Sequence, residues 1–303
     1  AWGARIAPRA HDPVALLGRL LVVIGLLCAG LAALLGYAPV LFFFLLAWTS
    51  NAEWGSLLAA QALGIGALLL APTFLMGATL PVAMQIAARL PGGTARIVGN
   101  LYALNTAGAI LGSLLAGLVL IPALRIQGSL EAMALLYAVP GTLLFALSGS
   151  RERPREIARL AAALLPCLAI LLASPRWRPD LLSSGLYLLR DPQRLQAARE
   201  LRLRDALPDT KNVELLYYKE GVSTTVAVRR TATGLSLSIG GKPDASDYVD
   251  MTSQALSVLL PVVLHPGEPK EILVIGLGSG VSAGAALALG LLKSGDHVVC
   301  GDV

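Results

Sequence analysis

Glu271-Ile-Leu-Val-Ile-Gly-Leu-Gly-Ser-Gly280 is the stretch that decides the fold of the C-terminal part of the chain. Its apolar run, Ile272 to Ile275, predicts a buried parallel strand, and the three alternating glycines predict a tight turn that lets a ligand approach the backbone. The run from Val281 to Leu292 then predicts a helix, whose first N–H groups favour polar or anionic ligand atoms. A strand, a glycine turn and a helix in this order are typical of a nucleotide-binding α/β domain, although the same pattern also occurs as a purely structural turn.

A small antiparallel sheet is predicted before this segment. Its strands are short runs rich in Val, Thr and Tyr, separated by glycine turns: Val213–Lys219, Val222–Arg230 and Leu235–Ile239. Gly240, Gly241 and Pro243 are expected to end the sheet.

The predicted α/β part begins with a helix from Met251 to Leu264, for which Asp250 is placed as the N-cap. The prolines at 266 and 269 end that helix before the glycine segment. A second strand is expected at 297–300, and Asp302 is the nearest acid that could bind ribose hydroxyls after it.

The composition places the chain in the membrane class. Of its 303 residues 55% are hydrophobic and 14% charged, and the mean hydropathy is +0.70, which is too apolar for a soluble protein of this size. Nearly all long apolar runs precede Pro175, and most of the charge follows it. We therefore expect a multi-span helical membrane domain at 1–175 and a second domain at 176–303, with the sheet at 213–240 and a partial nucleoside-binding domain at 250–303.

Five apolar runs are candidate spans, each close to the roughly 20 residues that a membrane helix needs. Pro72 is expected to break the second run, and Val40–Trp48 is too short to cross alone, so it either continues the first helix or lies at the interface. Gly108 and Gly112 form a small-xxx-small pair beside Asn105 in the third run. The five runs are Val14–Tyr37, Ser56–Ala71, Leu101–Leu124, Leu130–Leu147 and Ile157–Ala173.

The orientation in the membrane is left open by the sequence. Arginine clusters at 5–19 and 151–159 should both be cytoplasmic. Five spans satisfy both clusters but leave the second domain outside, whereas one more crossing, hidden around 38–50 or 73–90, would return it to the cytoplasm. We expect an integral protein of the bacterial inner membrane in either case.

Charge and sulfur chemistry limit the other function classes. The net charge of +5 is explained by arginines that flank the spans, and no basic patch interleaved with aromatic residues predicts nucleic-acid binding. Cys28 and Cys167 lie in apolar runs and are expected to be small core residues. The three histidines are far apart in sequence, so neither a metal site nor a disulfide framework is predicted.

Several segments together resemble spermidine synthase-like proteins, and in particular the bacterial branch with a multi-span membrane domain fused in front. The resemblance rests on an ordered set of motifs: Pro72-Thr-Phe-Leu-Met-Gly-Ala-Thr-Leu-Pro81, Asn105-Thr-Ala-Gly-Ala-Ile-Leu-Gly-Ser113, Pro179-Asp-Leu-Leu-Ser-Ser-Gly185, Tyr217-Tyr-Lys-Glu-Gly221, Ser238-Ile-Gly-Gly-Lys-Pro-Asp-Ala-Ser246, Asp250-Met-Thr-Ser-Gln254 and Ile275-Gly-Leu-Gly-Ser-Gly280.

The resemblance implies an aminopropyltransferase of polyamine biosynthesis with a Rossmann-like domain of the class I methyltransferase type, truncated here. Decarboxylated S-adenosylmethionine, or S-adenosylmethionine, would be a co-substrate rather than a tightly bound cofactor, and a small amine would be the acceptor. The lipid bilayer is the other implied partner, and a homo-oligomer is a further possible state. The general base of the family would lie beyond Val303, so the catalytic residue is unknown and the chain as given is expected to be inactive by itself.

The resemblance also assigns ligand-binding positions, several of which carry altered residues. A nucleoside-binding glutamine falls on Asp244, a diamine-binding histidine on Ser253, and a diamine-binding acid on Ser279. A ribose-binding acid falls on Cys300, which leaves Asp302 as the nearest carboxylate. The expected binding set is completed by Gly276, Gly278, Gly280 and Gln254.

Two other functions remain open at this stage. In the first, the membrane part carries or senses a polyamine or another cation, and the synthase-like domain is degenerate and regulatory. A cation path should contain acidic residues within the spans, and their lack weakens this alternative. In the second, a decayed domain only packs onto a membrane scaffold.

Overall fold

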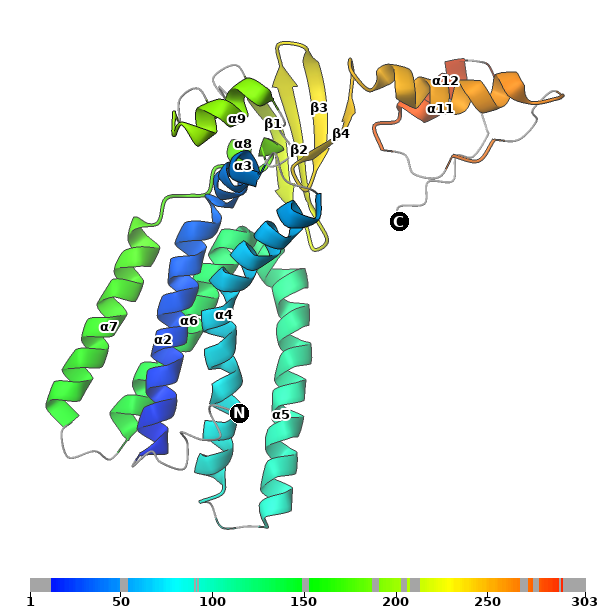
Figure 1. Ribbon diagram of the computed structural model, residues 1–303. Helices are drawn as coiled ribbons and strands as arrows, with labels where there is room; N and C mark the ends of the chain where they lie inside the picture. The colour runs from blue at the N-terminus through cyan, green and yellow to red at the C-terminus, as the bar shows by residue number, and fades with distance from the viewer. Residues whose placement is uncertain are drawn as a thin grey trace.

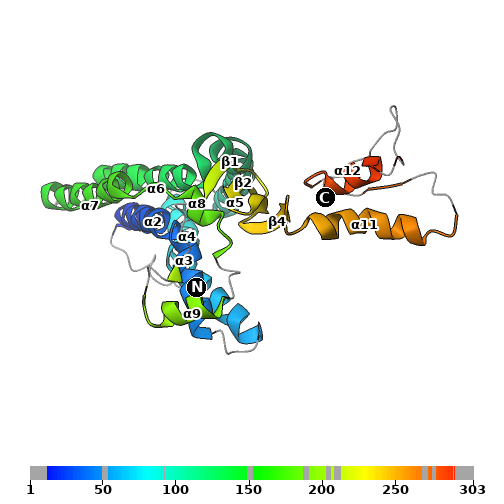
Figure 2. The same ribbon diagram turned by 90° about the horizontal axis from the view of Figure 1, so that it is seen from above.

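A computed structural model describes residues 12–49, 54–89, 91, 93–148, 153–186, 191–202, 206–207, 213–267, 272–274, 278–288 and 290. These residues form a bundle of long helices, a small sheet at one end of the bundle, and a pair of helices beyond the sheet (Figure 1). Seen from above, α11 (Met251–Leu264) and α12 (Val281–Ala288) lie on the far side of β4 from the bundle (Figure 2).

Three continuous helical stretches of the described chain are long and apolar enough to cross a membrane: Pro13–Leu35, Leu58–Ala87 and Ala95–Leu147. The last has 53 residues, which would extend about 80 Å as one straight helix, far beyond the roughly 30 Å of a hydrocarbon core. It is instead folded back at Arg125, whose backbone is non-helical with φ 63° and ψ 176°. The predicted long apolar helices are therefore confirmed, and by length and composition they suit a membrane.

Five long helices run side by side in the described bundle, and they correspond to the five predicted runs (Figure 1). A short π-helical segment, η2 (Ala116–Leu120), joins the third to the fourth before the reversal. The five are α2 (Pro13–Leu35), α4 (Trp54–Ala87), α5 (Thr94–Leu115), α6 (Ile121–Leu147) and α7 (Arg153–Ala173).

The predicted break at Pro72 is wrong, because α4 continues through both Pro72 and Pro81. Proline at 72 removes the helical hydrogen bond to the Leu68 carbonyl but does not end the helix, as is common in apolar helices. The run at 40–48 forms a separate helix, α3 (Ala38–Thr49), after the turn at Gly36. It lies at the sheet end of the bundle and does not extend α2 (Figure 1).

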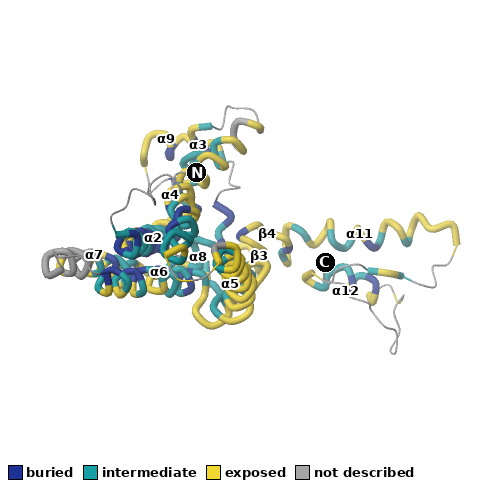
Figure 3. Tube along the Cα trace, turned by 90° about the horizontal axis from the view of Figure 1, so that it is seen from below, coloured by how far each residue is buried: buried dark blue, intermediate teal, exposed yellow. Residues whose placement is uncertain are grey.

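The core of the bundle is built around α2, which contacts α4, α6 and α7. Ile24 is fully buried there, together with Ala134 and Ala138 of α6. Cys28 and Cys167 are buried in the same cluster, as predicted for small core residues. By contrast, α5 is exposed along almost its whole length (Figure 3).

Glycines on α2 allow α6 to approach very closely. A Cβ added at Gly18 would meet the Gly141 carbonyl oxygen at 2.7 Å, and one added at Gly25 would meet the Ala134 carbonyl oxygen at 2.8 Å. At both positions the lack of a side chain therefore lets the backbones of α2 and α6 come into direct contact. The small pair on α5 behaves differently, since no other described element comes within 4 Å of a Cβ added at Gly108 or Gly112.

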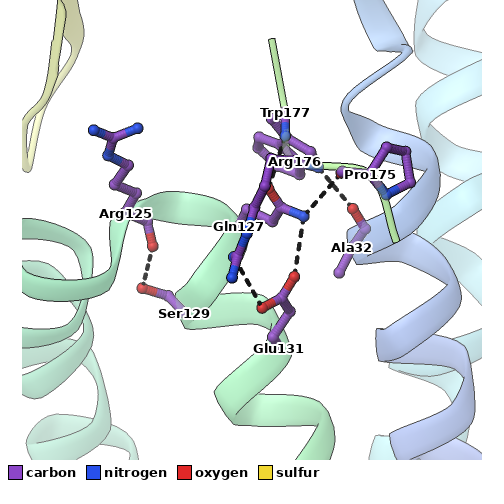
Figure 4. Close-up of polar contacts among 8 residues, drawn as sticks. All are labelled: Ala32, Arg125, Gln127, Ser129, Glu131, Pro175, Arg176 and Trp177. Atoms are coloured by element: carbon purple, nitrogen blue, oxygen red, sulfur yellow. Dashed lines mark hydrogen bonds and ion pairs between the residues drawn. The ribbon is translucent and has the colours of Figure 1, made fainter. Parts of the chain in front are cut away.

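A buried glutamine fixes the linker that leads from the bundle to the second domain (Figure 4). The Gln127 amide donates to Glu131 at 3.0 Å and to the Pro175 carbonyl at 3.2 Å, and it accepts the Trp177 N–H at 2.9 Å. The Trp177 indole in turn donates to the Ala32 carbonyl near the end of α2, at 2.7 Å. Both donors of this amide and its oxygen are thus engaged, and two of the three bonds position the linker.

After the linker, α8 (Pro179–Leu182) and α9 (Pro192–Arg199) precede the sheet. The helix α9 ends at Arg199, and Leu201 just after it has a left-handed φ of 56°. Its residues Leu195, Ala197 and Ala198 are buried against Phe43 and neighbouring residues of α3.

The sheet has four antiparallel strands in the order β1-β2-β3-β4, which confirms the predicted small antiparallel sheet and adds a strand. The strands are β1 (Glu214–Glu220), β2 (Thr225–Thr231), β3 (Gly234–Ile239) and β4 (Lys242–Ser246). The expected end of the sheet at Pro243 is wrong: Gly240 and Gly241 have φ of 58° and 81°, which turns the chain back so that Pro243 pairs with Ser238. Proline is tolerated there because β4 is an edge strand.

Glu220 at the end of β1 connects the sheet to the reversal in α6. One carboxylate oxygen accepts the Ile126 N–H at 2.5 Å, and the other accepts the Tyr218 hydroxyl at 2.9 Å. The Ile126 N–H is a donor that the non-helical Arg125 leaves without a helical partner, so the carboxylate acts as a cap supplied from a distant element. Burial, together with the charge of Glu220, raises the pKa of Tyr218.

The predicted Rossmann-like domain is not confirmed. The described part of its first strand, residues 272–274, has no strand pairing, and the second strand at 297–300 lies outside the described residues. A strand is defined by its ladder of hydrogen bonds, and 272–274 has no ladder partner in the described chain. What the structure does place is the turn at Gly278–Gly280 and α12 directly after it, packed beside α11.

Candidate functional site

The candidate site lies where β4, α11, the glycine turn and α12 meet. It is centred on Gln254, in the first turn of α11. The Gln254 side-chain oxygen accepts the Ser279 hydroxyl at 2.6 Å, and its amide nitrogen makes a long contact of 3.5 Å with the Asp244 carbonyl oxygen. Three of the sequence-predicted binding residues are therefore brought together from separate elements.

Two serines that the sequence analysis missed complete this cluster. The Ser282 hydroxyl donates to the backbone carbonyl of Gln254 at 3.0 Å and lies 3.2 Å from the Ser257 hydroxyl. Ser257 lies on α11 and Ser282 on the facing side of α12. The periodicity of each helix alone does not predict this contact, because it depends on how the two helices pack. The signal that could have found Ser282 is its place in the first turn of a helix that starts at a glycine turn.

The glycine turn has the backbone that the sequence predicts. Gly278 and Gly280 have φ of 53° and 79°, the left-handed region that favours glycine. Gly284 donates its N–H to the Gly280 carbonyl at 2.8 Å and so closes the first turn of α12. The N–H groups of the helical residues before Gly284 have no carbonyl of the same helix to bind, so they are available to a polar or anionic ligand atom.

The cluster is open to solvent and weakly charged. Ser279 and Asp244 are exposed, and Gln254 is half-buried. The Asp244 carboxylate lies 3.4 Å from the Lys242 ammonium group, which leaves little net charge beside the turn. Neutral hydroxyl and amide groups suit the hydroxyl groups and ring nitrogens of a nucleoside better than they suit an ammonium ion.

The remaining predicted residues have different fates. Ser253 is exposed and donates its hydroxyl to the Asp250 carbonyl at 2.9 Å, so it points along its own helix and not to Gln254. Asp250 occupies the N-cap position, but its side chain makes no cap hydrogen bond, because its backbone is already helical (φ −92°, ψ −8°). Gly276, Cys300 and Asp302 lie outside the described residues.

Cavities of the described chain lie beside the start of α11 and, away from the Gln254 cluster, at the junction of bundle and sheet. One, of about 310 Å³, lies beside the start of α11 and is lined by Ser246, Asp247, Tyr248 and Asp250 among others. The other, of about 320 Å³, lies between the α6 reversal, the linker and Glu220. In the described chain no group of three or more His, Cys, Asp and Glu side chains is arranged to hold a metal ion.

Comparison with family models, with curated protein sequences and with solved structures gives no match for this chain.

Proposed function

We propose that the protein is a membrane-anchored transferase of the spermidine synthase-like type, which moves an aminopropyl group from a decarboxylated S-adenosylmethionine-type donor to a small amine. The observation that supports this proposal best is the Gln254 cluster. The resemblance assigns Asp244, Gln254 and Ser279 to one ligand pocket, and these residues meet beside a left-handed glycine turn at the start of α12.

In this proposal the described residues bind and orient the donor. Gln254 and Ser279 can exchange their mutual hydrogen bond for bonds to the nucleoside hydroxyls, and the first N–H groups of α12 can bind further polar atoms of the donor. Transfer forms a carbon–nitrogen bond as the carbon–sulfur bond of the sulfonium breaks, and the electron pair leaves on sulfur. Because the sulfonium is already a good leaving group, alignment of the amine with the donor carbon is the main requirement.

Removal of the proton from the attacking amine needs a general base. Ser279 cannot hold an ammonium group by charge, so the acceptor must be held by groups outside the described cluster. The family resemblance places the base beyond Val303, and the proposal therefore concerns the full-length protein.

The test is binding of decarboxylated S-adenosylmethionine, S-adenosylmethionine and methylthioadenosine to the full-length protein in detergent. We expect one of the sulfonium ligands to bind, and we expect Gly278→Val to abolish binding because valine disfavours a φ of 53°. Gly267→Val is the matched control: this glycine is exposed, has no left-handed φ, and has open space around an added Cβ.

The preferred ligand separates aminopropyl from methyl transfer. Absence of binding for all three ligands would reject the proposal. If the same protein, placed in lipid vesicles, then takes up polyamine without converting it, the transporter function would replace the proposal. If it takes up none, the scaffold function would.

A further inference from the structure

Arginines near the ends of the long helices are distributed unevenly between the two ends of the bundle. The connection from α2 to α4, at the sheet end, contains no Lys or Arg over residues 36–53, and the α5–α6 reversal contains only Arg125 over residues 116–130. The linker after α7 adds Arg176 and Arg178 at this end. The opposite end carries more: Arg19, Arg89, Arg96, Arg153, Arg155 and Arg159.

Contacts between helices fix which helix ends lie together. The Arg19 guanidinium lies 5.4 Å from the centre of the Phe145 ring, so the start of α2 is beside the end of α6. At the other end of α2, the Ala32 carbonyl binds the Trp177 indole of the linker that follows α7. The start of α2 and the start of α7 therefore share one end, and the sheet lies at the other (Figure 1).

The structure removes the alternative of a hidden sixth crossing. The first place where such a crossing could lie, residues 38–50, forms α3, whose Phe43 and Leu46 are buried against α9 at the sheet end. In the second place, residues 73–90, the part from 73 to 87 belongs to α4, which is a single helix from Trp54 to Ala87. The chain thus runs along the bundle an odd number of times, five, between Pro13 and Ala173.

No described element after the bundle could return the chain through the membrane. The longest of these helices is α11, which has 14 residues and is therefore about 21 Å long, short of a hydrocarbon core of roughly 30 Å. The glycine turn and α12 lie beside α11, so they stay on the same side as the sheet.

We propose that the sheet and the Gln254 cluster lie on the non-cytoplasmic side of the membrane, and that the site takes its ligands from that side. Short connections rich in arginine stay in the cytoplasm, which assigns the end away from the sheet to the cytoplasm. The statement about ligands rests on the proposed transferase function: both the nucleoside donor and the amine acceptor must be solutes that reach the non-cytoplasmic compartment. The sidedness itself does not depend on that function.

The test is labelling of single cysteines in the full-length protein, with its native cysteines replaced, by a membrane-impermeant maleimide on intact spheroplasts and again after lysis. Thr233→Cys places the probe on the exposed turn between β2 and β3, and Arg96→Cys places it on an exposed position at the other end of the bundle. A cytoplasmic cysteine protein that stays unlabelled before lysis establishes that the spheroplasts are intact.

We expect the Thr233→Cys protein to be labelled fully before lysis and the Arg96→Cys protein only after it. Protection of Thr233→Cys in intact spheroplasts would overturn the proposal. Labelling of both variants before lysis would place the two ends on one side, which would overturn the count of five crossings. Because labelling needs no ligand, a negative result here differs from a failure to bind nucleoside, which would reject only the proposed function.

Discussion

Substitution of Gly25 by alanine should separate α2 from α6. The added Cβ would lie 2.8 Å from the Ala134 carbonyl oxygen and 2.8 Å from the Ala138 Cβ. Because non-bonded carbon atoms prefer about 3.5 Å or more, the helices must move apart by about 0.7 Å. Both opposing atoms belong to the backbone or to a Cβ, so no flexible side chain can yield instead. Overpacking of this kind costs about 1–3 kcal/mol.

Gly108→Ala is the matched control for this prediction. It makes the same chemical change within a long apolar helix, but in the described chain no other element comes within 4 Å of the added Cβ. Both variants gain the same helix propensity, about 1 kcal/mol, so this contribution cancels in the comparison. We expect unfolding of the full-length protein by SDS titration in micelles to show Gly25→Ala less stable than Gly108→Ala by about 1–3 kcal/mol. Equal stability, or a more stable Gly25→Ala protein, would refute the close crossing.

Two further predictions concern the contact between sheet and bundle. Glu220→Ala removes the acceptor for the Ile126 N–H, so the reversal should lose about 1–3 kcal/mol of local stability. Amide hydrogen exchange over residues 121–130 should therefore become faster. Glu220→Gln keeps an acceptor oxygen and should restore much of the protection from exchange. Burial and the Glu220 charge raise the pKa of Tyr218, so its neutral form contributes stability that is complete below the usual tyrosine pKa of about 10 and is lost as the pH rises above it. Thermal unfolding from pH 8 to pH 11 should therefore show a larger loss for the wild-type protein than for Tyr218→Phe, and parallel losses in the two proteins would contradict this.

The sequence determined much of the bundle because hydrophobic length is a property of consecutive residues. Each of the five predicted runs corresponds to a long helix, although their ends moved, since a helix end depends on turns and caps as well as on hydropathy. Proline was the misleading signal: Pro72 continues a helix and Pro243 lies in a strand. The effect of a proline depends on whether its missing N–H was needed, as it is not on the edge strand β4, and the residue type does not reveal that.

The candidate site was predictable only in part. The glycine turn and the start of α12 follow from local backbone requirements, so Gly278 and Gly280 were found from the sequence alone. The family resemblance assigned Gln254 and Ser279 to one pocket, but their hydrogen bond was not predicted, because the two residues are 25 positions apart. Ser257 and Ser282 joined them only through the packing of α11 on α12.

By itself the sequence determined that the chain has long apolar helices, a small antiparallel sheet and a glycine turn before a helix. These features depend on the order of neighbouring residues, because hydrophobic length, strand alternation and the backbone freedom of glycine are all local properties. Only the tertiary structure decided which helix ends lie together, that α3 stays at the sheet end, and that Glu220 caps the α6 reversal across 94 positions of sequence. Such contacts depend on how distant segments pack, because each surface is completed by a partner that the local sequence does not specify.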